Sequence, residues 1–298
     1  MNFDDDQLPQ PPDSGEQAPL ATQGPPGRRS PPFAPEPAYL DYESVPQDLS
    51  VPWGWLDLLL LALISLAVFL GLAVLLMVSL ALVHLSFAEI QTSPRLSGIL
   101  NVIADAFLFG ALIGYLALQM RLRFRAPFWR TVGWRPLETV RFSPGLSYLG
   151  LIALGFLLAL VVQTGSVLFG TKAKLPIEKL FQDRPTVIFV LGLSVFMAPL
   201  VEETIFRGYL YPVVARSFGR GVGVIATGTL FGLLHAAQLW GGWTQIALLV
   251  FVGLVLTYVR ATRKTVLASY LVHLGYNFTV SFGFLVSTHG LKVLAPGP

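Results

Sequence analysis

Long apolar segments separated by short polar loops dominate the chain from residue 55 onward. Most of them approach the roughly 20 residues that a helix needs to cross a bilayer. The pattern therefore predicts an all-α protein, a polytopic transmembrane helical bundle with about seven spans. The predicted spans are residues 55–85, 98–119, 146–169, 186–210, 222–240, 244–260 and 264–286.

The residues before the first apolar segment have a different composition. Residues 1–50 contain eleven prolines and nine acidic residues, against two basic residues. Such a segment buries too little apolar surface to offset the entropy of ordering it, so we expect a disordered, acidic, Pro-rich tail. The remainder divides into N-terminal transmembrane helices (51–185), a core that carries the candidate chemistry (186–286) and a C-terminal tail (287–298).

The distribution of basic residues predicts how the bundle is oriented. The loops after the second, fourth and sixth apolar segments are rich in arginine and would all lie on one side of the membrane. The positive-inside bias makes that side, and with it the N-terminal tail, cytoplasmic. The chain begins without the basic and apolar pattern of a signal peptide. We therefore expect an integral, multi-pass protein of the plasma membrane.

One loop does not follow this charge pattern. Residues 170–185 are predicted to be external, yet they carry a slight excess of positive charge. Apolar side chains are interspersed among the charges there, which favours a short helix lying in the membrane interface.

Composition narrows the possible chemistry. The mean hydropathy is +0.65 and only 12% of the residues are charged, which is typical of a membrane protein. The absence of cysteine excludes disulfides, thiolate metal sites and a cysteine nucleophile. The basic residues form no aromatic-interleaved patch, so we expect them to contact membrane lipids and no nucleic acid. The sequence leaves the oligomeric state open.

Two adjacent glutamates lie inside the fourth apolar segment. Carboxylates at membrane depth cost at least a few kcal/mol each, which makes Glu202 and Glu203 functional candidates. Arg207 follows Glu203 at the i, i+4 spacing that allows an ion pair on a helix, and that pair could be purely structural. Glu202 points about 100° away around the helix. It is the better candidate for a general base that takes a proton from water.

Three further polar residues occupy later apolar segments. His235 follows Phe231 at i, i+4, and His273 and Asn277 share one helix face at the same spacing. Each could be a hydrogen-bonding contact between helices, worth about 1 kcal/mol. Their occurrence together with two glutamates in the last four spans favours one shared hydrolytic site. The predicted helix ends place Glu202 and His235 at depths that differ by about 10 Å.

Other polar residues in the apolar segments receive no catalytic role. Asp105 could line a cavity or pair with a basic group, and the others are expected at interfaces, in loops or in helix packing. They are His84, Gln163, Thr164 and His289.

These motifs, in this order on three apolar helices, resemble the CPBP family of CAAX proteases and bacteriocin-processing (Abi-type) membrane proteins, which includes the Ras-converting CAAX endopeptidase. The motifs are Glu202-Glu203-x-x-x-Arg207, Phe231-x-x-x-His235 and His273-x-x-x-Asn277. The resemblance extends over about residues 186–286 and shows no departure at a motif position.

The resemblance implies an intramembrane glutamic endopeptidase. Glu202 and His235 would activate a water molecule, and His273 and Asn277 would form the oxyanion hole. Glu203 and Arg207 would orient the site. The partner would be a peptide or protein substrate, which in some family members is prenylated.

Two other readings remain open, and they differ in what the polar residues do. We expect no cofactor and no metal. A zinc-dependent endopeptidase would instead use Glu202, His235 and His273 as ligands, although Arg207 nearby would repel a cation. A binding, transport or immunity protein would use the same residues without catalysis.

Overall fold

The computed structural model describes residues 45–84, 86, 89–90, 93–137, 144–170, 181 and 183–294. These residues form helices joined by turns and loops, and none of them forms a strand, so the predicted all-α class is confirmed. The main elements are α1 (Trp55–Leu82), α3 (Pro94–Gln119), η2 (Met120–Phe124), α4 (Phe128–Thr131), α5 (Pro144–Phe169), α6 (Arg184–Gly192), η4 (Leu193–Met197), α7 (Ala198–Glu203), η5 (Thr204–Leu210), α8 (Tyr211–Phe218), α9 (Arg220–Leu234), α10 (Trp243–Arg263) and α11 (Val266–Ser287), where η marks a π-helical segment.

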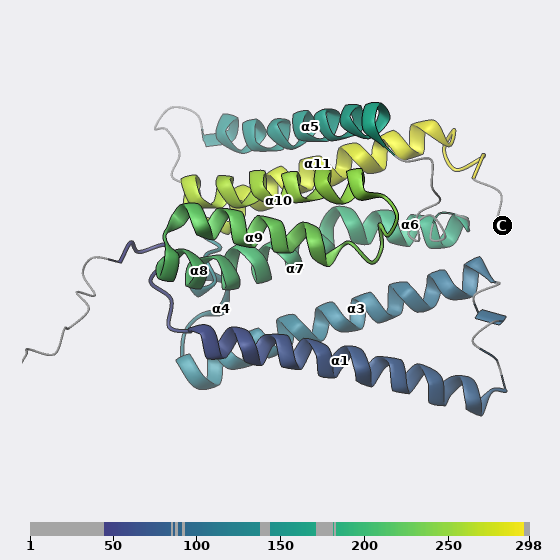
Figure 1. The fold of residues 1–298 in the computed structure, drawn as a ribbon, viewed down its shortest axis with the longest axis horizontal. Coiled ribbons are helices and arrows are strands. Elements are labelled where there is room, and N and C mark those ends of the chain that lie inside the picture. Colours follow the sequence, from purple (N-terminus) through teal and green to yellow (C-terminus); the bar gives the residue numbers. More distant parts are fainter. Residues whose placement is uncertain are drawn as a thin grey trace, which may run out of the picture. The chain divides into compact units, whose positions relative to one another are not determined.

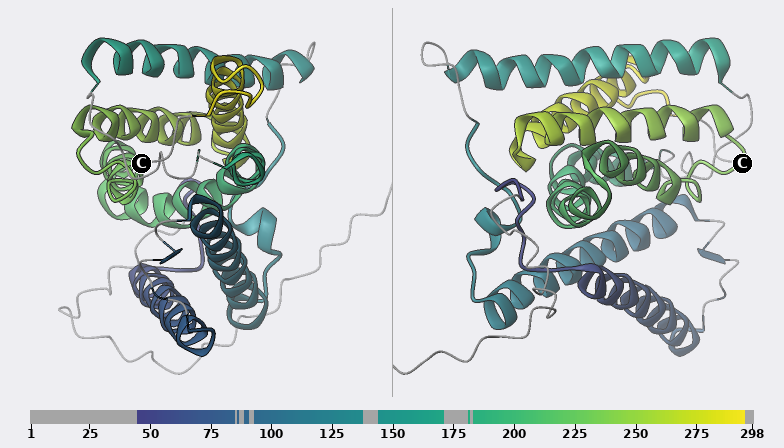
Figure 2. Two further views of the ribbon diagram at one scale, coloured as in Figure 1. Left: turned by 90° about the vertical axis from the view of Figure 1, so that its right-hand side faces the viewer. Right: turned by 60° about the vertical axis from the view of Figure 1, so that its left-hand side comes forward.

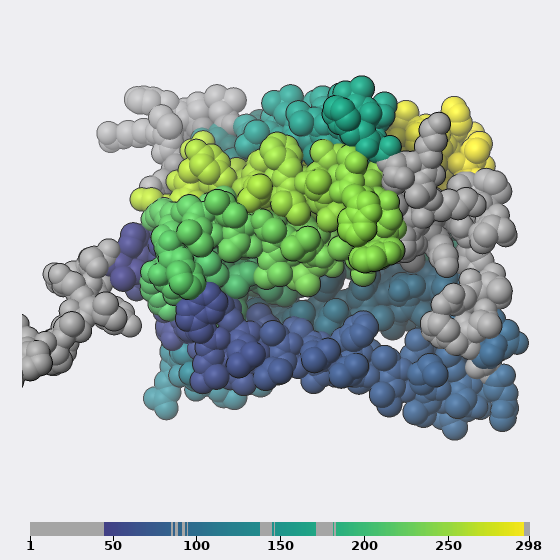
Figure 3. Space-filling model, viewed as in Figure 1, coloured from purple at the N-terminus to yellow at the C-terminus, as the bar shows by residue number. Residues whose placement is uncertain are grey.

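The helices are packed in successive layers (Figures 1 and 2). Helix α5 packs on α11, α11 lies beside α10, and α10 packs on α9, which also contacts α8. On the far side of the α6–α8 run, α1 and α3 form a hairpin, and α3 contacts α6 and α7. In the space-filling view the side chains of α1 meet those of α8 at one end, and a narrow opening separates the hairpin from α9 further along (Figure 3).

Five helical stretches of the described residues are long and apolar enough to cross a membrane. They are Trp55–Leu82, Arg95–Phe124, Ser147–Phe169, Arg184–Phe218 and Trp243–Arg263. Helix α9 is a shorter apolar helix, and α11 has 22 residues but carries His273, Asn277 and two tyrosines, which lower its hydropathy. The chain is thus an integral, multi-pass membrane protein, while the predicted count of seven spans is not confirmed.

Two predicted boundaries are wrong. The fourth span was expected at residues 186–210, but the helical run continues from α6 through α8 to Phe218. The fifth was expected at residues 222–240, but α9 ends at Leu234, and turns that lead into the adjacent Gly241 and Gly242 follow it. The sequence pattern failed because apolar residues continue on both sides of the true helix ends.

Two prolines interrupt the long helical run without ending it. Pro199 and Pro212 lack the N–H that would bond four residues back. The π-helical segment η4 directly precedes α7, which contains Pro199, and η5 directly precedes α8, which contains Pro212. The wider π turns let the chain pass each proline while staying helical, and such segments are frequent at functional sites.

Some residues that the composition placed in the tail pack against the bundle. Asp48 and Leu49 are both buried, and Leu49 contacts a cluster that includes Tyr211. Asp48 forms ion pairs with Arg220 at 2.9 Å and Arg260 at 3.5 Å. The Pro-rich composition of residues 1–50 therefore gave no indication that the segment around Asp48 and Leu49 is bound to arginines of the bundle.

The arginine-rich loops lie at one end of the bundle. The C-terminal ends of α3, α8 and α10 point the same way (Figure 1), as the alternation of spans requires. The basic residues of 121–135, 216–220 and 260–264 follow or occupy these ends. The predicted interfacial helix at 170–185 falls almost entirely outside the described residues.

Candidate functional site: two glutamates and two histidines in the bundle

The glutamate pair lies between two π-helical segments. Glu202 and Glu203 end α7, and Arg207 belongs to η5. The Arg207 Nη1 atom donates to Oε1 of Glu203 at 3.0 Å, and neither side chain is exposed to solvent. The ion pair predicted from the i, i+4 spacing is therefore present, and it is completely buried.

Residues of α9 and α10 contact the remaining donors and the face of the Arg207 guanidinium. Its Nε donates to Thr257 Oγ1 at 3.2 Å, and its Nη2 donates to the carbonyl of Gly253 at 3.0 Å. The guanidinium carbon lies 4.4 Å from the centre of the Phe231 ring, in a cation–π contact. A buried charge needs such compensation. The sequence offered no signal for Thr257 or Gly253, because one threonine and one glycine in an apolar helix form no motif.

Glu203 also holds one of the histidines. Its Oε1 lies 2.9 Å from Nδ1 of His273, a side chain that is only 4% exposed. Since the ionised carboxylate can only accept, Nδ1 of His273 carries the proton in this contact. The contact fixes the ring, with Nε2 turned toward Glu202.

Glu202 lies between the two histidines. One carboxylate oxygen is 3.8 Å from Nε2 of His235, and the other is 3.8 Å from Nε2 of His273. Both distances are too long for direct hydrogen bonds. A water molecule at about 2.8 Å from both atoms fits a gap of this size. Unlike Glu203, the Glu202 and His235 side chains are partly exposed, at 17% and 24%, so a small molecule can reach them.

The backbone of α9 sets the tautomer of His235. Its Nδ1 lies 2.8 Å from the carbonyl of Phe231, one turn earlier. Nδ1 therefore carries a proton, and Nε2 is the ring nitrogen that faces Glu202. The predicted Phe231-x-x-x-His235 motif thus has a defined structural role, in which the backbone of Phe231 orients the histidine and its ring supports Arg207.

The expected difference in depth between Glu202 and His235 was wrong. Gly219, with φ of 89°, turns the chain between α8 and α9, which pack against each other. Glu203 and His235 stand 16 residues before and 16 residues after this glycine. Two antiparallel helices that start at one turn bring such positions level. The error came from ending the fourth span too early.

Asn277 contacts a different part of the same helical run. It lies one turn beyond His273 on α11, and its Nδ2 donates to the carbonyl of Ser194 in η4 at 2.7 Å. One amide N–H is thus engaged and the other is available. The structure brings together Glu202, Glu203, Arg207, His235 and His273, while Asn277 ties α11 to the π-helical segment before the glutamates.

The polar residues that were given no catalytic role lie elsewhere, with one exception. Asp105 is half-buried on α3, near enough to Glu202 for the two carboxylates to repel each other. The other four lie in turns or on exposed helix faces: His84, Gln163, Thr164 and His289. Among the described residues, no group of three or more His, Asp or Glu side chains has an arrangement suited to a metal ion.

The fold and the site define a multi-pass membrane protein that gathers its polar side chains inside a helical bundle. Residues 184–279 match the family model described as type II CAAX prenyl endopeptidase Rce1-like, a protease family. The matched residues run from α6 into α11 and contain all three motifs. The resemblance to the CAAX protease family is confirmed for this part of the chain.

A curated protein also matches part of the chain. An uncharacterized 24.3 kDa protein of Escherichia coli is 33% identical over 122 residues, which cover 38% of this chain and 55% of the relative. The chain thus spans about half the length of that relative. No solved structure matches the chain.

Proposed function

We propose that the protein is an intramembrane endopeptidase of the CAAX type that cleaves a peptide bond with a water molecule activated by Glu202. The observation that carries the proposal is the position of Glu202, level with His235 and His273 at 3.8 Å from each. The match of residues 184–279 to a protease family supports the same reaction class.

The side chains suggest a division of roles. Glu202, as the ionised carboxylate, takes a proton from the water while the lone pair on Nε2 of His235 accepts a second hydrogen bond from it. The resulting hydroxide attacks the peptide carbonyl. Glu202 or His235 then delivers the proton to the leaving amine. His273 donates from Nε2 to the developing oxyanion, and Glu203 stabilises the positive charge on its ring.

Glu203, Arg207 and Asn277 support this chemistry in different ways. Glu203 and Arg207 hold His273 and the helical run in place from fully buried positions. Asn277 has one amide N–H left to donate to the oxyanion after its bond to Ser194. We propose a peptide or protein substrate that reaches the site from the membrane, prenylated near its C-terminus, as the name of the matched family suggests.

The test is peptide cleavage by purified protein in lipid nanodiscs, with plain and prenylated peptides and detection by mass spectrometry. The variant Glu202→Gln keeps the side-chain shape and removes the base. We expect it to lose a factor of about 10²–10⁴ in rate. The matched control is Glu89→Gln, which makes the same change at an exposed carboxylate outside the bundle core.

Adding the chelator EDTA distinguishes a glutamate-activated water from a zinc-dependent mechanism. Activity that resists EDTA but disappears in Glu202→Gln supports the proposal. Loss of activity with EDTA and recovery with zinc would replace it with a metalloendopeptidase. Peptides that bind to the wild type but are never cut would show a binding protein instead.

A further inference from the structure

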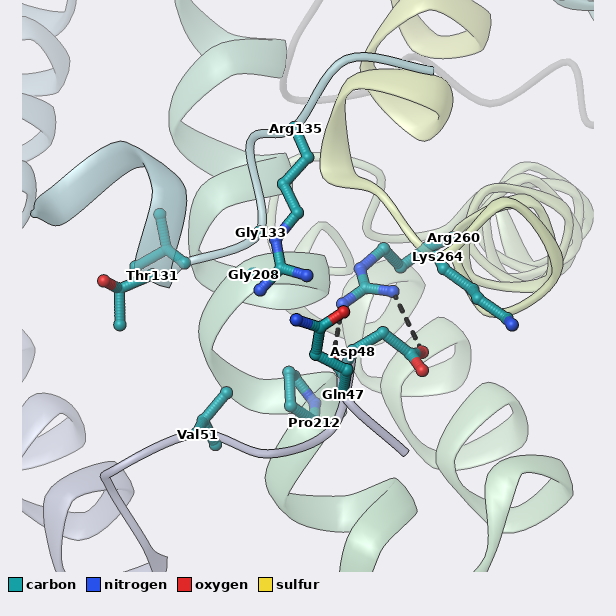
Figure 4. Close-up of a pocket in the computed structure, with 11 residues that line it drawn as sticks. Gln47, Asp48, Val51, Thr131, Gly133, Arg135, Gly208, Pro212, Arg260 and Lys264 are labelled. Atoms are coloured by element: carbon teal, nitrogen blue, oxygen red, sulfur yellow. Dashed lines mark hydrogen bonds and ion pairs between the residues drawn. The ribbon is translucent and has the colours of Figure 1, made fainter. Parts of the chain in front are cut away.

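A small cavity lies at the arginine-rich end of the bundle (Figure 4), and neither glutamate of the pair lines it. It is enclosed by the segment before α1, the loop after α4, the start of α8 and the end of α10. Its volume of about 10 Å³ for the centre of a water-sized sphere leaves room for one oxygen-sized atom. The lining that matters here is Asp48, Gly133, Arg135, Gly208, Arg260 and Lys264.

The charge in this cavity is unbalanced. The guanidinium groups of Arg135 and Arg260 point toward it, Lys264 lies at its edge with the amine turned outward, and Asp48 is the one acidic residue of its described lining (Figure 4). Asp48 is shared, because Oδ1 also accepts from Arg220 at 2.9 Å. Two guanidinium groups of the lining therefore face a single carboxylate that Arg220 also uses, and Lys264 adds a further positive charge at the edge.

Hydrogen-bond donors are left over as well. Arg260 is 1% exposed, and within the described part of the chain its Nε and Nη1 have no hydrogen-bond partner; Nη1 lies 3.5 Å from Asp48 Oδ2. Arg135 has a buried Nε in the same condition. Unmet donors on buried guanidinium groups are costly, and two such groups in one cavity also repel each other. An oxyanion removes both penalties, because its oxygens accept from several donors at once.

We propose that this cavity is a binding site for a phosphate group. One phosphate oxygen occupies the enclosed space against Arg260, and the remaining oxygens stay at the mouth, where Arg135 donates to them and the exposed Lys264 can swing in from the edge. The site lies at the end of the bundle that we predict faces the cytoplasm, at the level of the lipid headgroups, where anionic lipids concentrate. The phosphate is thus that of a lipid headgroup or a soluble one. This binding does not depend on the proposed protease activity.

The first experiment uses inorganic phosphate and delipidated protein in a non-ionic detergent. Phosphate should raise the melting temperature of the wild type in a saturable way, beyond the effect of sodium chloride at the same ionic strength. The test variant is Arg135→Gln with Lys264→Gln, which leaves the buried Arg260 and its bond to the Asp48 carbonyl in place. Each lost charge should weaken binding about fivefold, so the double variant should bind on the order of 25-fold more weakly.

The matched control is Arg263→Gln, an exposed arginine in the same last turn of α10 that does not line the cavity. It should keep the affinity of the wild type. Equal stabilisation of the wild type and the double variant, or no stabilisation beyond the chloride control, would overturn the proposal for soluble phosphate.

The second experiment distinguishes the sources. Native mass spectrometry of protein extracted from vesicles of phosphatidylcholine with phosphatidylglycerol reports the lipids that stay bound. Retention of phosphatidylglycerol by the wild type and by Arg263→Gln, with loss in the double variant, identifies a headgroup site. A response to inorganic phosphate without retained lipid identifies a soluble ligand. If the double variant behaves as the wild type does in both experiments, the cavity is not a phosphate site.

Discussion

The α1–α3 hairpin and the packed core of α5, α9, α10 and α11 differ in how much of their apolar surface other parts of the protein bury. Only 6% of the most apolar stretch of α1 is buried by protein, against 44% for α10. A β-carbon added at Gly110 of α3 would meet nothing within 4 Å, whereas one at Gly253 of α10 would lie 2.2 Å from the Gly228 carbonyl. The hairpin thus presents side chains to lipid, while the core brings helix backbones into contact.

This difference explains where the polar residues can lie. Helices in a membrane gain little from burying apolar surface against each other, so close backbone approach and interhelical hydrogen bonds hold them together. The core achieves that approach through glycines, and it surrounds the Glu203–Arg207 pair with partners from three helices. In the hairpin, the buried Asp57 and Gln119 and the half-exposed Arg123 form a network at the helix ends instead.

Among the substitutions considered, loss of Arg207 from the polar core should lower the free energy of unfolding most. Arg207→Ala removes the ion-pair partner of Glu203 at a fully buried position and leaves its charge to the His273 contact. The free energy of unfolding should fall by about 3–5 kcal/mol. Thermal melts in detergent should show a much larger effect than for Asn277→Ala, which removes one hydrogen bond to a backbone carbonyl. A larger loss for Asn277→Ala would contradict the assigned pairing.

Glycine contacts offer the next test. Gly155→Ala on α5 would place a β-carbon 2.1 Å from the Val272 carbonyl of α11, so the two helices must move apart. We expect a loss of about 1–3 kcal/mol in the free energy of unfolding. Gly150→Ala, on the same helix with open space around it, is the control and should be neutral or slightly stabilising. Equal effects would mean that close backbone contact does not hold the core.

A smaller effect is expected where the hairpin meets the core. Trp53 is buried, stacks on Tyr209 with ring centres 4.7 Å apart, and donates from Nε1 to the Tyr209 carbonyl at 2.9 Å. Trp53→Phe keeps an aromatic ring and loses this bond, which should cost about 0.5–1.5 kcal/mol of stability. Trp55→Phe removes a similar bond to Ser217 from an exposed ring, so urea or thermal unfolding should show less change.

The smallest effect should come from the lipid-facing side of the hairpin. Phe69 on α1 is 60% exposed in the protein. Phe69→Leu keeps an apolar group in the lipid and removes little protein contact, so the free energy of unfolding should change by less than about 0.5 kcal/mol. A larger shift in thermal melts would show that another protein surface covers this part of α1.

Much of this arrangement could be predicted from the sequence. Apolar length indicated the helices, and the three motifs indicated which polar residues meet. The contacts that complete the site were not predictable, because Thr257 and Gly253 become partners of Arg207 only when α10 packs on η5. The end of the fourth span was missed because a π-helical segment lets the chain pass Pro212, and no local pattern distinguishes such a passage from a helix end.

Because the chain turns at Gly219, the number of residues on each side of this glycine determines which side chains meet in the site. Glu202 and His235 face each other because nearly equal lengths of chain, 17 and 16 residues, separate them from Gly219 on its two sides. A residue inserted on one side of Gly219 alone would shift Glu202 or His235 by about 1.5 Å along its helix and rotate it by about 100° about the helix axis. A second insertion on the other side of Gly219 would bring the two side chains back to the same depth, but they would no longer point toward each other. The number of residues between Glu202 and Gly219, and between Gly219 and His235, therefore matters to the chemistry as much as the identity of the two side chains.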